Sequence, residues 1–320
     1  ISGSTAANVA TTGVFTIPLM KKSGYSPRFA AATEASASTG GQILPPIMGA
    51  AAFVMADVIS VSYLEIIGAA LIPALLFYLA IWMSVHFEAK RLGLNPIPKD
   101  QRPTLREGLF NIETLLLPII VLITMLVLRY TPTTAAVAAY FTALLIYLFS
   151  WRSPGSFMDR LKSIPAALEA GAMTAAMIAV IIGSVAIIAS VISLTGLGLK
   201  VSSVILVVSG GDVLVTLLLA MVVAIILGMG LPTVAAYMLA ASVVAAAFIE
   251  AGLPSLSAHL FILYFAILSG VTPPVALAAY IGGAIAGSHW FKTALTATKI
   301  SLGGFLIPFM FIYHPPLLGN

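Results

Sequence analysis

The chain has 320 residues, of which 60% are hydrophobic and 8% are charged, and its formal net charge is +4. This composition is typical of a polytopic membrane protein and excludes a soluble domain. The lack of cysteine excludes disulfides, iron–sulfur clusters and thiolate zinc sites, and the excess of basic residues lies in connecting segments, where it indicates membrane topology and not nucleic-acid binding.

The first part of the chain predicts a re-entrant hairpin arm followed by a broken helix. The motif Ile1-Ser-Gly-Ser-Thr-Ala-Ala7 leads into Ser4–Met20, which is shorter than the ~20 apolar residues that a bilayer requires. Arg28–Ala56 is long enough, but Pro45-Pro46 interrupts it, and proline removes a backbone donor and clashes with the preceding turn. We expect this helix to break near mid-membrane, where irregular backbone must be buried in protein or face a cavity. Since no initiator methionine precedes the motif, we infer that the chain is a fragment.

Further apolar segments are predicted to span the membrane as helices, which makes the fold class all-α. They are Ser62–Val85, Ile112–Leu128, Thr134–Phe149, Ala166–Leu194, Val213–Leu227 and Ala294–Tyr313. Between the first two, the polar connector Phe87–Asn111 is expected to be either a plain solvated loop or a loop with a surface helix. Val201–Val208 is too short to span and is expected at the outer interface.

The hairpin arm and the broken helix recur 228 residues later. Gly228-Met-Gly-Leu-Pro-Thr-Val-Ala235 precedes the short arm Thr233–Ile249, and Pro273-Pro274 interrupts Ala258–Ile285. A duplicated unit whose apolar segments are broken at corresponding places points to the binding site of a secondary transporter. We accordingly divide the chain into a first repeat at residues 1–86, a cytoplasmic connector at 87–111, a second half at 112–313 and a tail at 314–320.

The positions of Lys and Arg predict that the two repeats are inverted in the membrane. Lys21–Arg28, His86–Glu107 and Trp151–Pro165 are basic and are expected in the cytoplasm, whereas Glu250–Ser257 has no Lys or Arg and is expected outside. The first hairpin then opens to the cytoplasm and the second to the exterior, an arrangement compatible with alternating access.

The two tips and their proline breaks are candidate ion sites, because backbone groups freed inside lipid need partners. A desolvated cation suits the carbonyls, and half-helix N-termini suit an anion. Hydroxyl and carbonyl oxygens fit sodium better than zinc. In the first set Ser2, Ser4, Thr5 and Asn8 face Ser36, Ser38, Thr39, Gly40, Gly41 and Gln42, and in the second Gly228, Gly230 and Thr233 face Ser269, Gly270 and Thr272. The alternative is that these small residues only allow close helix packing.

Glu34 lies about two turns into the first broken helix, and a carboxylate inside the membrane is a functional candidate. Three roles stay open: it couples protons, it orients neighbouring Ser and Thr side chains, or it pairs with Lys22 or Arg28 near the cytoplasmic boundary. The four histidines share no spacing, and no nucleotide-binding or nucleophile motif stands in a suitable context. We therefore predict no enzyme activity, no catalytic residue, no resident metal site and no cofactor besides the coupling ion.

These residues resemble the large membrane subunit of TRAP (tripartite ATP-independent periplasmic) transporters over nearly the whole chain. The resemblance is carried by ISGSTAANVATTGVFTIPLM, GMGLPTVAAYML and LSGVTPPVALAAYIGGAIAGS. Ala32–Ser36, Gly40–Pro46 and the closing segment from Lys299 most resemble the TAXI branch, in which the small and large membrane subunits are commonly fused.

The resemblance implies an importer in the inner membrane of a bacterium or archaeon. Such a protein receives a small organic anion, such as a C4-dicarboxylate, from a periplasmic solute-binding protein and moves it by ion-driven symport, with an elevator-like transport domain on a fixed scaffold. Further implied partners are the lipid bilayer and a small membrane subunit, here expected to be fused upstream. The family's sodium sites map onto Ser2, Gly3, Ser4, Thr5, Gly40, Gly41, Ile43 and Pro45, and onto Gly230, Thr233, Ser269, Gly270 and Thr272.

By the same mapping the substrate lies between the hairpin tips, near Asn8, Ser36, Ser38 and Thr39. Glu34 stands where the sialic-acid and dicarboxylate branches are expected to carry a small or apolar residue. This difference makes the proton a candidate coupling ion besides sodium. Two alternatives stay open. One is a two-hairpin carrier that works without a binding protein, as in sodium/dicarboxylate or citrate symport. The other is a channel or scaffold subunit, and a channel needs a continuous polar path rather than two closed breaks.

Overall fold

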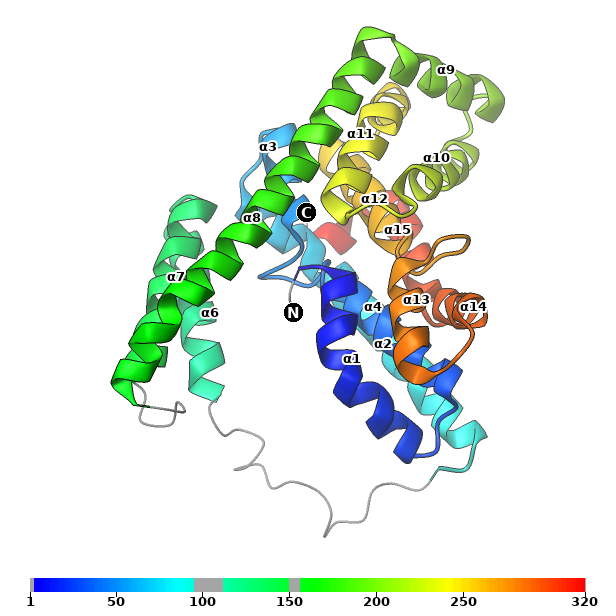
Figure 1. The fold of residues 1–320 in the computed structure, drawn as a ribbon. Coiled ribbons are helices and arrows are strands. Elements are labelled where there is room, and N and C mark those ends of the chain that lie inside the picture. Colours follow the sequence, from blue (N-terminus) through cyan, green and yellow to red (C-terminus); the bar gives the residue numbers. More distant parts are fainter. Residues whose placement is uncertain (1–2, 95–111, 150–155, 320) are drawn as a thin grey trace. The chain divides into compact units, whose positions relative to one another are not determined.

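The computed structural model describes residues 3–94, 112–149 and 156–319, and every regular element within those ranges is a helix (Figure 1). Four of the described helices are long and apolar enough to cross a membrane, and a fifth span results if the bent pair Ile182–Ile192 and Leu197–Ser209 counts as one. The all-α polytopic fold is thereby confirmed. Ser2 and most of the predicted connector, residues 95–111, lie outside the described residues.

The chain folds as two compact units, Ile1–Asn95 with Ile181–Asn320, and Pro96–Val180. The N-terminal part of the larger unit contains α1 (Thr5–Lys22), α2 (Pro27–Gly40), α3 (Ala50–Ile59) and α4 (Tyr63–Arg91). Its C-terminal part begins inside α8 (Phe157–Leu194) and continues with α9 (Leu197–Ser209), α10 (Val213–Gly228), α11 (Thr233–Glu250), α12 (Ser255–Leu268), α13 (Leu277–Ala286), α14 (Trp290–Ile300), α15 (Leu302–Tyr313) and the 3-10 turn η2 (Pro315–Leu318).

The smaller unit contains α6 (Ile112–Val127), α7 (Pro132–Phe149) and the first part of α8. α6 packs against α7. The Tyr147 hydroxyl lies 2.9 Å from Ser163 Oγ, and Arg160 donates to Leu148 O at 3.1 Å, so α8 is tied to the end of α7. The basic segment Trp151–Pro165, predicted to lie in the cytoplasm between two spans, includes the start of α8 at residue 157.

Polar side chains fix where α1 and α2 begin. Ser4 accepts a hydrogen bond from Ala7 N (3.4 Å), and Ser26 accepts one from Phe29 N (3.2 Å). Such N-cap bonds satisfy amides that have no partner inside the helix. Pro27 occupies the first turn of α2, where its missing amide proton has no cost.

The two predicted repeats have matching helix bounds. α1 and α11 each have 18 residues, and both ends of α11 lie 228 positions after those of α1. The same offset relates both ends of α2 and α12. The breaks that follow contain Met48 and Ala276, again 228 positions apart, with φ of 48° and 47°. Because non-glycine residues seldom adopt positive φ, its recurrence indicates that both breaks follow the same backbone path.

The half-helix that follows each break packs against the other repeat. α3 contacts α11 and α12, whereas α13 contacts α1 and α2. A Cβ on Gly282 of α13 would lie 3.0 Å from Ala31 O of α2, which shows how closely these helices approach. Each repeat is therefore completed by a half-helix of the other, and α2 and α12 are buried along most of their lengths.

The last predicted span, Ala294–Tyr313, is divided at Ser301 into α14 and α15. Ser301 is buried and donates to Ser36 Oγ of α2 at 3.0 Å. A Cβ on Gly304, three residues later, would lie 2.5 Å from an aromatic ring of α4, so glycine there lets α15 pack directly on α4. α4 itself continues further than predicted, to Arg91.

Candidate ion and substrate site

The tip before α1 lies against the first helix break. Gly3 has a φ of +69°, and a Cβ at this position would lie 3.2 Å from Met48 O. Gln42 Nε2 donates to Thr5 Oγ1, and Gly49 N donates to Gln42 O at 2.9 Å, which holds the two sides of the break together. Both the backbone conformation and the close approach require glycine at position 3. The structure therefore brings Gly3 and Thr5 to the break.

Gln42 carries a buried oxygen without a hydrogen-bond partner in the described part of the chain. The side chain is 2% exposed, and its Oε1 accepts no hydrogen bond there. A Cβ on Gly49 would lie 3.3 Å from Gln42 Oε1 and 3.3 Å from Gly3 O, so both oxygens lie close to Gly49. An unpaired buried acceptor costs about 1–3 kcal/mol. Amide and carbonyl oxygens are ligands that suit a hard cation.

Polar side chains line the interface between α1 and α2, starting at the tip. They recur three or four residues apart on each helix, so they occupy one face of each. We name this set the polar column, and its members are Thr5, Asn8, Thr12 and Thr16 on α1, Glu34 and Ser38 on α2, and Gln42 two residues after the end of α2.

Glu34 is the centre of the hydrogen bonds in the polar column. Thr12 Oγ1 donates to its Oε1, Thr16 Oγ1 donates to its Oε2 at 2.5 Å, and Ser38 Oγ donates to its Oε1 at 3.3 Å. Ser38 in turn accepts from Asn8 Nδ2 at 2.9 Å. Thr12 and Thr16 were not predicted as site residues, because their spacing becomes informative only once α2 is known to be the facing helix.

Glu34 does not form the ion pair that was one of its predicted roles. Its side chain is 8% exposed, and none of the described Lys and Arg residues, Lys22 and Arg28 included, lies within ion-pair distance of it. Lys21, from the same end of α1, instead donates to Ala286 O at 3.0 Å. Ala286 is the last residue of α13, and the helix dipole favours a cation at the C-terminal end of a helix. The observed contacts correspond to the role of orienting Ser and Thr side chains.

Two of the predicted substrate residues on α2 face away from the polar column. Ser36 Oγ donates to a carbonyl of α14 at 3.1 Å, and Thr39 Oγ1 donates to a carbonyl of its own helix at 2.8 Å. Both side chains are fully buried. Of the four substrate candidates, the structure brings together Asn8 and Ser38.

The other residues predicted at the first break contribute packing. A Cβ on Gly40 would lie 2.8 Å from the Phe77 ring, so glycine lets α2 approach α4. Gly41 follows the last residue of α2 as its C-cap. Ile43 is buried and Pro45 is half-buried. At Gly40 close packing accounts for the small residue, as the alternative interpretation proposed.

At the second break Ser269 joins the tip to the broken helix. Its Oγ donates to Gly228 O at 3.0 Å, and a Cβ on Gly228 would lie 2.7 Å from Ser269 Oγ. Gly270 O accepts from Ala278 N at 3.0 Å, much as Gln42 O accepts across the first break. The structure therefore brings Gly228, Ser269 and Gly270 together.

Three residues complete the second set. Gly230 forms the turn with a φ of +73°, and Thr233 begins α11 and is half-buried. Thr272 Oγ1 donates to Leu268 O at 2.7 Å. A Cβ on Gly230 would lie 3.5 Å from Val275 of the break, which places the turn beside it.

The two sites differ because the second repeat has no polar column. The residues 228 positions after its members are Thr233, Ala236, Ala240, Val244, Ile262, Ala266 and Gly270. Thr5 alone keeps its residue type. The second site therefore offers backbone carbonyls and hydroxyls, whereas the first adds a buried amide oxygen and a carboxylate held by three hydroxyls.

Comparison with known proteins gives a match over almost the whole chain. The family model described as "Tripartite ATP-independent periplasmic transporter, DctM component" matches residues 1–319. The isethionate TRAP transporter permease protein DctMQ of Oleidesulfovibrio alaskensis is 27% identical over 90% of this chain and 44% of its own length. The C4-dicarboxylate TRAP transporter large permease protein DctM of Pseudomonas aeruginosa is 27% identical over 90% of this chain and 66% of its own length.

A third relative matches a smaller part. The 2,3-diketo-L-gulonate TRAP transporter large permease protein YiaN of Escherichia coli is 28% identical over 48% of this chain and 36% of its own length. The chain spans between about two fifths and two thirds of the length of the two relatives that it matches over 90% of its residues.

Proposed function

The chain belongs to the DctM-component family of tripartite ATP-independent periplasmic transporters, and we propose that it forms the part of an importer that moves a small organic anion inward with an ion gradient. It is a multi-pass membrane protein of the bacterial inner membrane type, and the relatives compared above are bacterial. An archaeal membrane, which the sequence left open, has no support among them.

The proposed solute class is a small organic anion. The relatives are described for isethionate, C4-dicarboxylates and 2,3-diketo-L-gulonate, all of which are small anions. In this chain, Asn8 and Ser38 are neutral polar side chains beside the first tip, and α1 and α11 have their N-terminal ends at the two tips. Helix N-termini favour negative charge, so an anion between the tips is compatible with both ends.

The proposed partners are a periplasmic solute-binding protein and a small membrane subunit, as the family description implies. Assignment to the TAXI branch, with the small subunit fused upstream, is part of the same proposal and rests on the motifs around Ala32–Pro46. Purifying the permease from its native membrane and identifying the co-purifying chains by mass spectrometry tests it. A separate small subunit would contradict the fusion.

The proposed coupling ion is sodium, bound at both breaks. At the first break the oxygens of Gln42, Gly3 and Thr5 would bind it, and at the second the oxygens around Ser269 and Thr272 would do so. The observation that carries this proposal is the buried Gln42 Oε1, which accepts no hydrogen bond among the described residues and, like Gly3 O, lies close to Gly49. The second site is inferred from the repeat and lacks such an unpaired side-chain oxygen.

The proposed mechanism is alternating access of the elevator type. Its support is the repeat of hairpin arm and broken helix, with α3 and α13 exchanged between repeats, and the placement of Lys and Arg that predicts opposite orientations. Glu34 is proposed to add proton coupling, since a carboxylate with three hydroxyl donors inside the membrane is a functional candidate.

Solute uptake into proteoliposomes tests the function. Uptake by the wild-type permease should require an inward sodium gradient and the binding protein. Thr5→Val and Thr233→Val should each weaken the dependence on sodium while the protein stays folded. Unchanged sodium dependence in both variants would remove the site assignment, and uptake without a binding protein would favour the independent symporter instead.

A further inference from the structure

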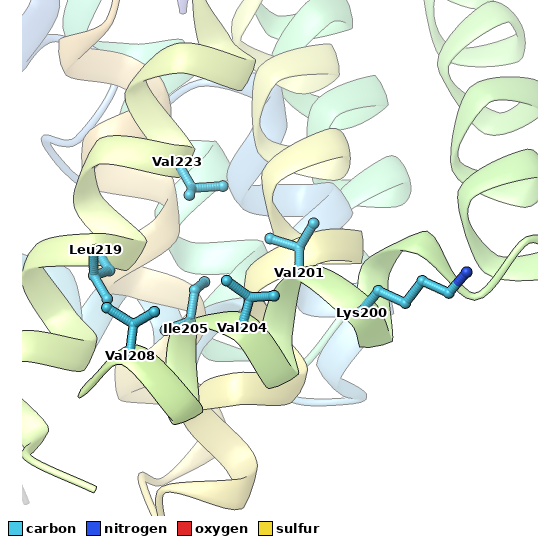
Figure 2. A pocket seen from close by; sticks show the side chains of 7 residues that line it. All are labelled: Lys200, Val201, Val204, Ile205, Val208, Leu219 and Val223. Atoms are coloured by element: carbon cyan, nitrogen blue, oxygen red, sulfur yellow. The ribbon is translucent and has the colours of Figure 1, made fainter. Parts of the chain in front are cut away.

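An apolar groove lies between α9 and α10, away from the two helix breaks. It has a volume of about 280 Å³ and is lined by Lys200, Val201, Val204, Ile205, Val208, Leu219 and Val223. Figure 2 shows the α9 residues in a row, with Leu219 and Val223 facing them from α10 and with Lys200 at one end, its ammonium directed away from the valines.

The groove exists because α9 is held against a different helix. Ser202 Oγ donates to Val243 O of α11 at 2.7 Å. A Cβ on Gly198 would lie 2.5 Å from Ser242 O, so α9 and α11 are in close contact. The lining residues of α9 recur at helical spacing on a different face from the one that contacts α11. The valine side chains on this face are short, so a groove stays open between α9 and α10.

The lining identifies the chemical class of the ligand. Apart from Lys200 it consists of aliphatic side chains, so a polar solute would lose its hydrogen bonds with water and gain none. Val204 is 59% exposed and Val208 is 63% exposed, whereas Ile205 forms a buried floor. A hydrocarbon chain matches this surface, and an ammonium at one end matches a phosphate.

We propose that this groove binds one acyl chain of an anionic phospholipid, with Lys200 beside the headgroup phosphate. The site is separate from the proposed ion and substrate sites, and its occupancy does not depend on which solute is carried. A transmembrane helix of a partner subunit would also cover aliphatic side chains, but it would give the ammonium of Lys200 no phosphate.

Lipid binding to the purified permease tests this site. The permease in detergent is titrated with phosphatidylglycerol or with phosphatidylcholine of the same acyl chains, and bound lipid is counted by native mass spectrometry. The wild type should retain phosphatidylglycerol more tightly. Lys200→Ala should weaken phosphatidylglycerol binding about fivefold, since one basic residue near an anionic lipid surface contributes about that much. It should weaken phosphatidylcholine binding less, because the choline cation of that lipid offsets its phosphate charge. Lys292→Ala, at an exposed lysine of α14, is the charge control.

A matched pair of tryptophan variants tests the groove itself. Val204→Trp should fill it and release most of the bound lipid of both kinds. Val207→Trp should leave retention unchanged, because Val207 is 79% exposed and does not line the groove. Equal retention by the two variants would overturn the proposal, as would equal affinity of the wild type for the two lipids. If Val204→Trp leaves lipid binding intact and dissociates a second chain, the groove is a protein interface and the proposal fails.

Discussion

Replacing Thr5 and Gln42, the hydrogen-bonded pair that joins the first tip to its break, should separate ion binding from protein stability. The double variant Thr5→Val with Gln42→Leu removes a hydrogen-bonded pair as a whole. It also deletes the buried Gln42 Oε1, which has no hydrogen-bond partner within the described residues. The change therefore removes a proposed sodium ligand and a destabilising unpaired acceptor together.

Opposite effects are expected without and with sodium. Replacing both partners of a hydrogen bond by apolar groups is close to neutral, whereas an unpaired buried acceptor costs about 1–3 kcal/mol. Without sodium the variant should thus be as stable as the wild type or more stable by up to about 3 kcal/mol. With sodium at about 100 times the Kd of the first site, that site should add about 2.7 kcal/mol to the stability of the wild type by mass action. The variant should lack this gain and keep only the gain from the second site.

The apparent unfolding midpoint in lipid nanodiscs, in NaCl and in KCl of equal ionic strength, measures both effects. The wild type should have the higher midpoint in NaCl, and the double variant should have a smaller difference between its two midpoints, because only the second site still binds sodium. Ser36→Ala is the control, because this buried hydroxyl of α2 bonds to α14 and its loss should lower both midpoints and keep their difference. A sodium shift of wild-type size in the double variant would refute the assignment of a sodium site to this tip.

Three further predictions address the carboxylate and the helix contacts. Glu34→Gln should change the pH profile of uptake while the protein stays folded, because an amide still accepts hydroxyl hydrogen bonds; an identical profile would leave Glu34 with a structural role. Gly228→Ala should lower the free energy of unfolding by about 1–3 kcal/mol, since the new Cβ would lie 2.7 Å from Ser269 Oγ. Adding Ser269→Ala should recover part of the lost stability, and no recovery would show that the clash with Ser269 does not cause the loss. Gly304→Ala should lower the free energy of unfolding by a similar amount, because its Cβ would lie 2.5 Å from an α4 ring. Gly68→Ala should instead stabilise the protein by roughly 0.5–1 kcal/mol, because a Cβ on Gly68, within α4, has nothing within 4 Å in the described structure. Equal loss of stability in both variants would contradict the packing described here.

The helix breaks were predictable because their causes are local. Proline acts on its own helical turn, and the predicted arms Ser4–Met20 and Thr233–Ile249 differ by at most two residues at each end from α1 and α11. The repeat was predictable for the same reason, because glycine and proline at matching positions impose the same local backbone conformation. The matching φ of Met48 and Ala276 shows that even an unusual conformation recurs at the same offset.

The partners of each helix were not predictable, because a helical pattern shows which face is apolar and not what covers it. The exchange of α3 and α13 between repeats has no signal in spacing. For the same reason the sequence placed Ser36 with Ser38 at the site, although the two side chains face different helices. Thr12 and Thr16 were passed over as ordinary residues of an apolar segment until the facing carboxylate gave them a role.

Sodium-gradient-driven accumulation in proteoliposomes is the most direct test of the central proposal. The permease is reconstituted with its small subunit, and uptake of a labelled organic anion bound to the solute-binding protein is followed with and without an inward sodium gradient. The proposal predicts accumulation above the outside concentration that requires both the gradient and the binding protein and is lost in the Thr5→Val, Gln42→Leu variant. Passive equilibration that is independent of sodium and unaffected by the variant would contradict it and indicate a channel.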